Sequence, residues 1–225
     1  MSNSEQRELH ASDGGHVSAY HVRPATRVRG GLVIVQEIFG VNAHIRRVAD
    51  GFAQAGYEVI APALFDRIER GVELDYDAEG RSQGKALAMQ LGLDRPLLDI
   101  QAAIAQLSTS GKVGVVGYCW GGSLAFLSAT RLDGVSAAVG YYGGLIARFA
   151  SEVPRAPVLL HFGEQDAGIP LADVQKVRAA RPDVEIELYP AQHGFNCEAR
   201  TSYDAVSSER ALARSLAFLE HHLTA

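Results

Sequence analysis

Short apolar runs, many of them β-branched, alternate with longer amphipathic stretches along most of the chain. The run at 31–36 is typical of a strand buried on both faces of a parallel sheet. Similar runs predict strands at 57–61, 112–116, 135–141, 157–162 and 184–189. Helices are predicted at 43–55, 96–108, 121–131, 170–180 and 203–223. Strands that alternate with helices predict an α/β fold, with a mainly parallel central sheet flanked by helices on both faces.

Two parts of the chain follow this pattern less clearly. Residues 1–16 are predicted as a polar lead-in, and 17–22 as an edge strand that ends before Pro24. The segment 66–84 is polar and has no clear period, which predicts either a long surface loop or a cap near an active site. Because no linker interrupts the pattern, we expect a single domain over 1–225.

Composition excludes several functional classes. The 225 residues are 47% hydrophobic and 21% charged, which is typical of a folded domain with a sizeable core. A net charge of −5 argues against nucleic acid or an anionic membrane as the main partner. The N-terminus is polar, and no apolar run approaches the ~20 residues of a membrane-spanning helix. We expect a cytoplasmic protein that acts on a small molecule, as a monomer or alternatively a homodimer.

Cys119 stands in a pattern that predicts a nucleophile. The stretch Gly-Tyr-Cys-Trp-Gly at 117–121 follows a predicted strand and precedes a predicted helix. In such an elbow the nucleophile is strained and its neighbours must be small, which explains the glycines. The helix N-terminus favours a thiolate. The alternative is a buried structural cysteine beside a chance pair of glycines.

A nucleophile on such an elbow needs an acid and then a histidine later in the chain. Asp166 and His193 both follow predicted strands, at the edge of the sheet where α/β proteins bind ligands. Glu164 is an alternative acid. His161 is an alternative base, but it precedes Asp166 and lies within a strand, so we interpret it as a core residue. We interpret the remaining histidines as surface side chains: His10, His16, His21, His44, His221 and His222.

The loop after the first central strand supplies further candidates. Backbone N–H groups of Ile38 and Trp120 are predicted to form an oxyanion hole. Glu37 is predicted to lie beside Cys119, where it pairs with the thiol or with a nearby cation. The alternative for Glu37 is a solvated loop carboxylate.

With these motifs assembled, the sequence resembles the dienelactone hydrolase family (carboxymethylenebutenolidases), which has the α/β-hydrolase fold. The resemblance runs from about 30 to 223 and is carried by Gln-Glu-Ile-Phe-Gly at 36–40, Gly-Tyr-Cys-Trp-Gly-Gly at 117–122, Gly-Glu-Gln-Asp at 163–166 and His-Gly-Phe at 193–195.

The resemblance implies a triad of Cys119, His193 and Asp166, with Glu37 holding the resting thiol until substrate arrives. It implies that a dienelactone is opened to maleylacetate through a thioester. It also implies no metal and no organic cofactor, and no Cys/His cluster in the sequence has zinc-ligand spacing.

The resemblance further implies arginines that hold the substrate carboxylate. Arg81 lies in the segment where one of them occurs, with a solvated arginine as the alternative. Cys197 occupies the second position, so Arg200 is the substitute candidate, and we interpret Cys197 as a packed thiol. Gly194 replaces a serine, and Lys85 replaces an aromatic residue, of better-known members.

These differences leave two alternative functions open. One is a carboxylesterase that acts on another small ester or lactone. The other is a non-catalytic protein of the same fold that binds a small molecule.

Overall fold

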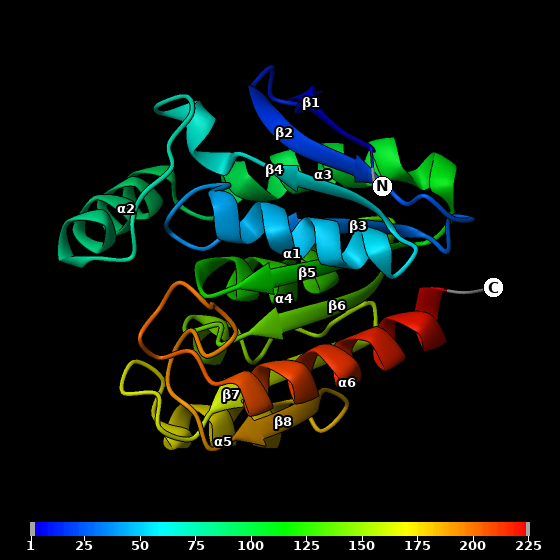
Figure 1. Ribbon diagram of the computed structural model, residues 1–225. Helices are drawn as coiled ribbons and strands as arrows, with labels where there is room; N and C mark the ends of the chain where they lie inside the picture. The colour runs from blue at the N-terminus through cyan, green and yellow to red at the C-terminus, as the bar shows by residue number, and fades with distance from the viewer. Residues whose placement is uncertain (1–2, 224–225) are drawn as a thin grey trace.

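An eight-stranded sheet runs through the computed structural model, which describes residues 3–223 (Figure 1). The strands are β1 (Asn3–His10), β2 (His16–Arg23), β3 (Gly31–Val35), β4 (Glu58–Pro62), β5 (Val113–Tyr118), β6 (Val135–Tyr141), β7 (Val158–Gly163) and β8 (Glu185–Tyr189). Their order is β1-β2-β4-β3-β5-β6-β7-β8. β2 is antiparallel to both of its neighbours, and all pairs from β4 to β8 are parallel. The predicted mainly parallel sheet is confirmed.

Helices cover both faces of the sheet. They are α1 (Ala43–Gln54), α2 (Ala78–Leu91), α3 (Asp94–Leu107), α4 (Trp120–Arg131), α5 (Leu171–Ala180) and α6 (Ala205–Leu223). Short 3₁₀ turns are η1 (Leu64–Arg67), η2 (Ser108–Ser110) and η3 (Ile146–Arg148). α1 and α6 lie on one face and α3 and α4 on the other (Figure 1). Every residue of β3, β4, β5 and β7 is buried, because central parallel strands have helices on both sides.

β1 lies where the sequence pattern predicts only a polar lead-in. It pairs along its whole length with β2, with Glu5 opposite His21. The segment 17–22 is therefore a strand as predicted, but it is not at the edge of the sheet. β1 is rich in polar residues because it forms that edge itself, with one side open to solvent.

α2 begins inside the segment 66–84, where the sequence pattern indicates no helix. Asp77 caps it, because its carboxylate accepts a hydrogen bond of 2.7 Å from the N–H of Gly80. Much of the buried face of α2 is glycine, which leaves almost no apolar periodicity to recognise. At Gly84 the helix approaches the backbone so closely that a Cβ would overlap the carbonyl oxygen of Ile38. Figure 1 shows α2 beyond the carboxyl ends of the strands.

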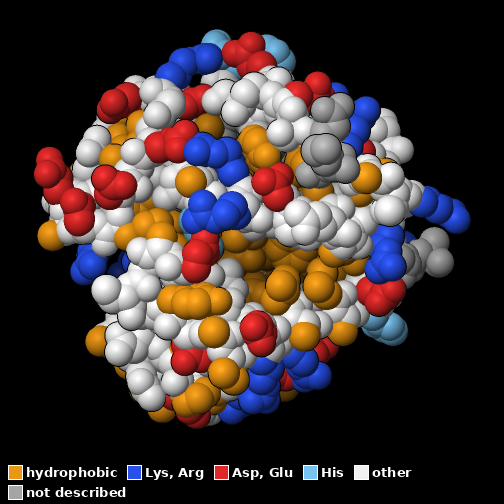
Figure 2. Space-filling model, in the orientation of Figure 1, with side chains coloured by type: hydrophobic (Ala, Val, Ile, Leu, Met, Phe, Trp, Pro, Cys, Tyr) orange, Lys and Arg blue, Asp and Glu red, His pale blue; other side chains and the backbone are white. Residues whose placement is uncertain are grey.

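The face that carries α1 and α6 is hollowed near its middle. Figure 2 shows hydrophobic side chains gathered in this hollow and charged side chains around it. Among residues 3–223, no helix combines the length and the apolar character needed to cross a membrane.

Candidate active site

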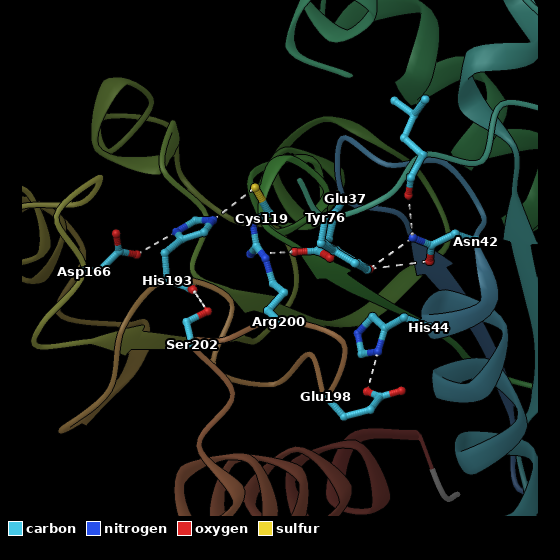
Figure 3. Close-up of polar contacts among 11 residues, drawn as sticks. Glu37, Asn42, His44, Tyr76, Cys119, Asp166, His193, Glu198, Arg200 and Ser202 are labelled. Atoms are coloured by element: carbon cyan, nitrogen blue, oxygen red, sulfur yellow. Dashed lines mark hydrogen bonds and ion pairs between the residues drawn. The ribbon is translucent and has the colours of Figure 1, made fainter. Parts of the chain in front are cut away.

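Four strand ends bring the predicted site residues together. Cys119 follows β5, Asp166 follows β7, His193 follows β8, and Glu37 follows β3. These strands are parallel, so their carboxyl ends meet at one edge of the sheet. Figure 3 shows the four side chains gathered there.

Cys119 sits on a strained turn between β5 and α4. Its backbone angles are φ 56° and ψ −116°, a conformation that costs a non-glycine residue about 1–3 kcal/mol. The turn closes because α4 starts against β3: a Cβ at Gly121 would overlap the carbonyl oxygens of Val35 and Gln36. The strand, turn and helix predicted from the glycine pattern are confirmed.

His193 connects the thiol to a buried carboxylate. Its Nε2 lies 3.2 Å from the Sγ of Cys119, and its Nδ1 lies 2.7 Å from Oδ2 of Asp166. The other carboxylate oxygen of Asp166 accepts a hydrogen bond from the N–H of Gly168 at 2.8 Å. Asp166 is therefore held in place and accepts a hydrogen bond from the imidazole on the side away from the sulfur.

The environment of His193 favours its charged form. Burial by itself lowers the pKa of this imidazole, but the neighbouring Cys119 and the hydrogen bond to Asp166 raise the pKa to about 10. A protonated His193 donates one hydrogen bond to the sulfur and one to the carboxylate. The surroundings of His193 therefore stabilise its imidazolium form.

The rival acid and base lie elsewhere. Glu164 is exposed, and Asp166 is the carboxylate that contacts His193. His161 is fully buried and bonds to the hydroxyls of Tyr189 at 2.8 Å and Ser215 at 2.9 Å. Burial lowers the pKa of His161 to about 3, so this imidazole is neutral. Its interpretation as a core residue is confirmed.

A pocket of about 550 Å³ lies beside Cys119 and His193, a size that suits a small molecule. Ile38 and Trp120, the residues predicted to supply the oxyanion hole, both line it. Trp120 is also the first residue of α4, so its N–H lies at the start of the helix.

The chain matches the model of the dienelactone hydrolase family over residues 17–223. It belongs to this family. The carboxymethylenebutenolidase of Pseudomonas putida is 35% identical over 227 residues, which cover 96% of each chain. A Synechocystis protein assigned as a carboxymethylenebutenolidase is 35% identical over 194 residues, covering 77% of this chain and 78% of its own. The crystal structure of a Klebsiella pneumoniae protein assigned as a dienelactone hydrolase is similar with a TM-score of 0.84 at 30% identity, covering 96% of this chain and 98% of its own.

Membership of the dienelactone hydrolase family, together with these relatives, makes the chain a hydrolase of the dienelactone hydrolase type. The two residues expected to bind a substrate carboxylate nevertheless lie outside the pocket wall. Arg81 is exposed on α2, and Arg200 lies beside Cys119 and points to Glu37 (Figure 3). The positive charges that do line the pocket are Lys85, one turn beyond Arg81, and Arg148 of η3.

Lys85 and Arg148 are available to a ligand. Within residues 3–223, neither side chain forms an ion pair or hydrogen bond with another group. Sequence reasoning identified Lys85 only as a departure from the dienelactone hydrolase pattern and missed Arg148. Arg148 follows β6, so the strand-end rule that located Asp166 and His193 also points to it.

Glu37 is fully buried and pairs with Arg200. The Nη1 of Arg200 lies 3.4 Å from Oε1 of Glu37, and its guanidinium carbon lies 5.4 Å from the ring centres of both Phe39 and Tyr76. Burial lowers the pKa of Arg200, but the charge of Glu37 raises it, and the net result is a pKa above the ordinary value of arginine. Of the two predicted arrangements for Glu37, the structure adopts the pair with a cation (Figure 3).

Two histidines interpreted as surface side chains are buried, so that interpretation is wrong for them. His21 is 1% exposed and bonds to Glu5 of β1 at 2.9 Å. His44 is 2% exposed and bonds to Glu198 at 2.7 Å. In both cases the glutamate partner lies on a different segment of the chain. The residues next to each histidine in the sequence therefore do not indicate that it is buried.

Cys197 is fully buried, which confirms its interpretation as a packed thiol. Burial and the charge of Glu37 raise its pKa to about 11, and a hydrogen bond with Tyr76 opposes this rise. The group at Cys197 is therefore a protonated thiol at neutral pH.

Proposed function

We propose that this protein is a cysteine hydrolase that opens a small lactone or ester bearing an anionic group, with a dienelactone as the leading substrate. Cys119 is the nucleophile, His193 the base and Asp166 the group that orients His193. The single observation that carries the proposal is the hydrogen-bonded chain from Cys119 through His193 to Asp166 at the wall of the pocket.

The first step is acyl transfer to sulfur. The Cys119 thiolate attacks the lactone carbonyl, a C–S bond forms, and the carbonyl electrons move onto oxygen. The N–H groups of Ile38 and Trp120 stabilise this oxyanion. When the oxyanion collapses, the ring C–O bond breaks and the ring oxygen leaves as an enolate. The charged His193 gives this enolate its proton and becomes neutral. A stabilised leaving group of this kind suits a thiolate, which is a weaker base than an alkoxide.

The second step is hydrolysis of the thioester. Neutral His193 removes a proton from water, the resulting hydroxide attacks the thioester carbonyl, and the C–S bond breaks to regenerate the thiolate. The product is a free carboxylic acid. Asp166 holds His193 in the tautomer that carries its proton on Nδ1 and stabilises the charged imidazole formed in this step.

The substrate class follows from the charges in the pocket. Lys85 and Arg148 line its wall, and no carboxylate in the described residues 3–223 neutralises either of them. A substrate carboxylate gains charge-assisted hydrogen bonds from such groups. This supports an anionic lactone or ester over a neutral one, although the cations differ from the arginines that the family resemblance implies.

The proposal is tested with the purified full chain on cis-dienelactone, trans-dienelactone and p-nitrophenyl acetate. We expect a higher kcat/KM for a dienelactone than for the neutral ester, and turnover of every substrate to be lost in Cys119→Ala. Glu164→Gln is the matched control near the site, since Glu164 is exposed. A preference for the neutral ester contradicts the substrate assignment, and unchanged turnover by Cys119→Ala contradicts the nucleophile.

A further inference from the structure

Three side chains of metal-binding type converge around the buried Glu37. A carboxylate oxygen of Glu37, an imidazole nitrogen of His44 and the Sγ of Cys197 all lie within 4.8 Å of one another. The residues are 0%, 2% and 0% exposed. They come from the loop after β3, from α1 and from the loop between β8 and α6. Ligands this far apart in the chain have no recognisable spacing, so the sequence does not reveal the group.

Two of these side chains have a buried polar atom without a partner. Neither Oε2 of Glu37 nor Nε2 of His44 has a hydrogen-bond partner in the part of the chain that the structure describes. A buried polar atom left in this state costs about 1–3 kcal/mol. Both atoms belong to residues of the convergent group. One ligand that bonds to these two atoms and to the Cys197 sulfur would therefore satisfy both of them.

The opposite side of each of these two residues is already held. Nδ1 of His44 donates to Oε2 of Glu198 at 2.7 Å, and Arg47 donates to the other oxygen of Glu198 at 2.6 Å. With the His44 proton on Nδ1, its Nε2 presents a lone pair. Arg200 engages Oε1 of Glu37 and leaves Oε2 open. Figure 3 shows His44 between Glu198 and Tyr76. A carboxylate behind a histidine ligand is the usual outer partner at zinc sites.

We propose that Glu37, His44 and Cys197 bind a thiophilic divalent cation of the zinc class. One sulfur, one imidazole nitrogen and one carboxylate oxygen form a donor set that suits Zn²⁺ or Co²⁺, whereas Ca²⁺ and Mg²⁺ require oxygen ligands. On binding, Cys197 releases its proton to solvent, and its thiolate and the Glu37 carboxylate, which also faces Arg200, are the two negative ligands of the ion.

The geometry predicts what the cation does to the protein. Bonds of about 2.0–2.3 Å place the ligands of a tetrahedral site roughly 3.3–3.8 Å apart, so binding draws the three segments inward by at most roughly 1–1.5 Å. Because the three ligand residues are buried, no substrate reaches the cation, and its role is to stabilise the structure. The ion would tie the His193 loop to α1 and to the Glu37 loop, and it would stabilise the fold without entering the hydrolytic step.

The experiment is a Co²⁺ titration of the metal-free full chain, read by the thiolate-to-cobalt charge-transfer absorption. The two cysteines provide matched variants. We expect the wild type and Cys119→Ser to bind one Co²⁺ with this band, and Cys197→Ser to lose it. Cys119→Ser removes the proposed nucleophile, so retention of the band there separates this site from the proposed activity. The proposal is overturned if the wild type shows no such band, or if Cys119→Ser loses it and Cys197→Ser keeps it.

Thermal unfolding with and without Zn²⁺ is the second measurement. Zn²⁺ is expected to raise the Tm of the wild type and of Cys119→Ser, but not that of His44→Asn, which leaves both cysteines intact. Glu198→Gln, which changes the outer partner of His44 and leaves the three proposed ligands intact, should weaken Co²⁺ binding by roughly 10–100-fold. Circular dichroism of each metal-free variant establishes that it is folded. An equal rise in Tm for His44→Asn would also overturn the proposal.

Discussion

The guanidinium of Arg200 lies against the backbone of Gly194, where a Cβ at position 194 would overlap it. Gly194 also has φ 77°, in the region that favours glycine. Because residue 194 has no side chain, the guanidinium of Arg200 can reach the carboxylate of Glu37. Gly194 replaces the serine that the family resemblance implies, and Arg200 replaces an arginine at position 197. The contact between them shows that the two differences are structurally linked.

This relationship predicts that Gly194→Ser is more destabilising than a serine at another glycine with positive φ. Gly71 is the matched control, since it has φ 71° and a Cβ added to it would meet no heavy atom within 4 Å. Gly71→Ser should lower the free energy of unfolding by about 1–2 kcal/mol through backbone strain alone. Gly194→Ser should cost at least about 1 kcal/mol more, because it also separates Arg200 from buried Glu37. Urea denaturation measures both values.

A double-mutant cycle isolates the contact between the two residues. In an Arg200→Ala background, the penalty of Gly194→Ser should fall to that of Gly71→Ser. A penalty that is the same with and without Arg200 would show that the two residues are not coupled.

Asp166 and Glu164 provide a direct comparison of two nearby carboxylates. Asp166→Asn should lower kcat/KM by roughly 10²–10⁴-fold, because an amide neither holds His193 in the required tautomer nor stabilises its charge. Glu164→Gln should leave kcat/KM unchanged, since Glu164 is exposed. Equal losses in the two variants would contradict the assignment of Asp166.

The titration of His193 should depend on Cys119. Burial lowers the pKa of His193, whereas Cys119 and Asp166 raise it to about 10. Removal of the sulfur in Cys119→Ser should therefore bring the pKa down. NMR titration of the imidazole, with His193→Gln used for assignment, measures the shift. An unchanged pKa in Cys119→Ser would contradict the effect of the Cys119 sulfur on His193.

The same shift predicts how stability changes with pH. Because the folded-state pKa lies above the ordinary value of 6.5, the imidazolium stabilises the folded state. This contribution is fully present below pH 6.5 and is lost as the pH rises through about 10. The difference in unfolding free energy between the wild type and His193→Gln should shrink across this window.

Lys85 and Arg148 should affect substrate binding more than chemistry. For a substrate that carries a carboxylate, Lys85→Ala and Arg148→Ala should each raise KM by about three- to tenfold and leave kcat nearly unchanged. Neither change should affect a neutral ester. Arg81→Ala tests the competing assignment, because Arg81 is exposed one turn away on the same helix. A rise in KM confined to Arg81→Ala would return the carboxylate contact to that residue.

Local patterns were sufficient to predict much of the sheet and the turn at Cys119. The run before Cys119 is apolar because β5 is buried on both faces, and the glycines around it are required by the close approach of α4 to β3. The sequence pattern did not predict α2, because the helix packs on Ile38 through Gly84, and a buried glycine adds nothing to an apolar period. β1 escaped because an edge strand tolerates polar residues.

The sequence by itself determined the order of strands and helices and the strand ends that bear Cys119, Asp166 and His193, because burial and turn geometry impose periods and residue types over a few neighbouring positions. Only the tertiary structure decided that Glu37 meets Arg200, that His44 is buried under Glu198, and that Lys85 and Arg148 face the pocket. These contacts join loops and helices far apart in the chain. Each contact depends on how those segments are placed relative to one another. The hydrophobic periodicity of a single helix or strand contains no information on that placement.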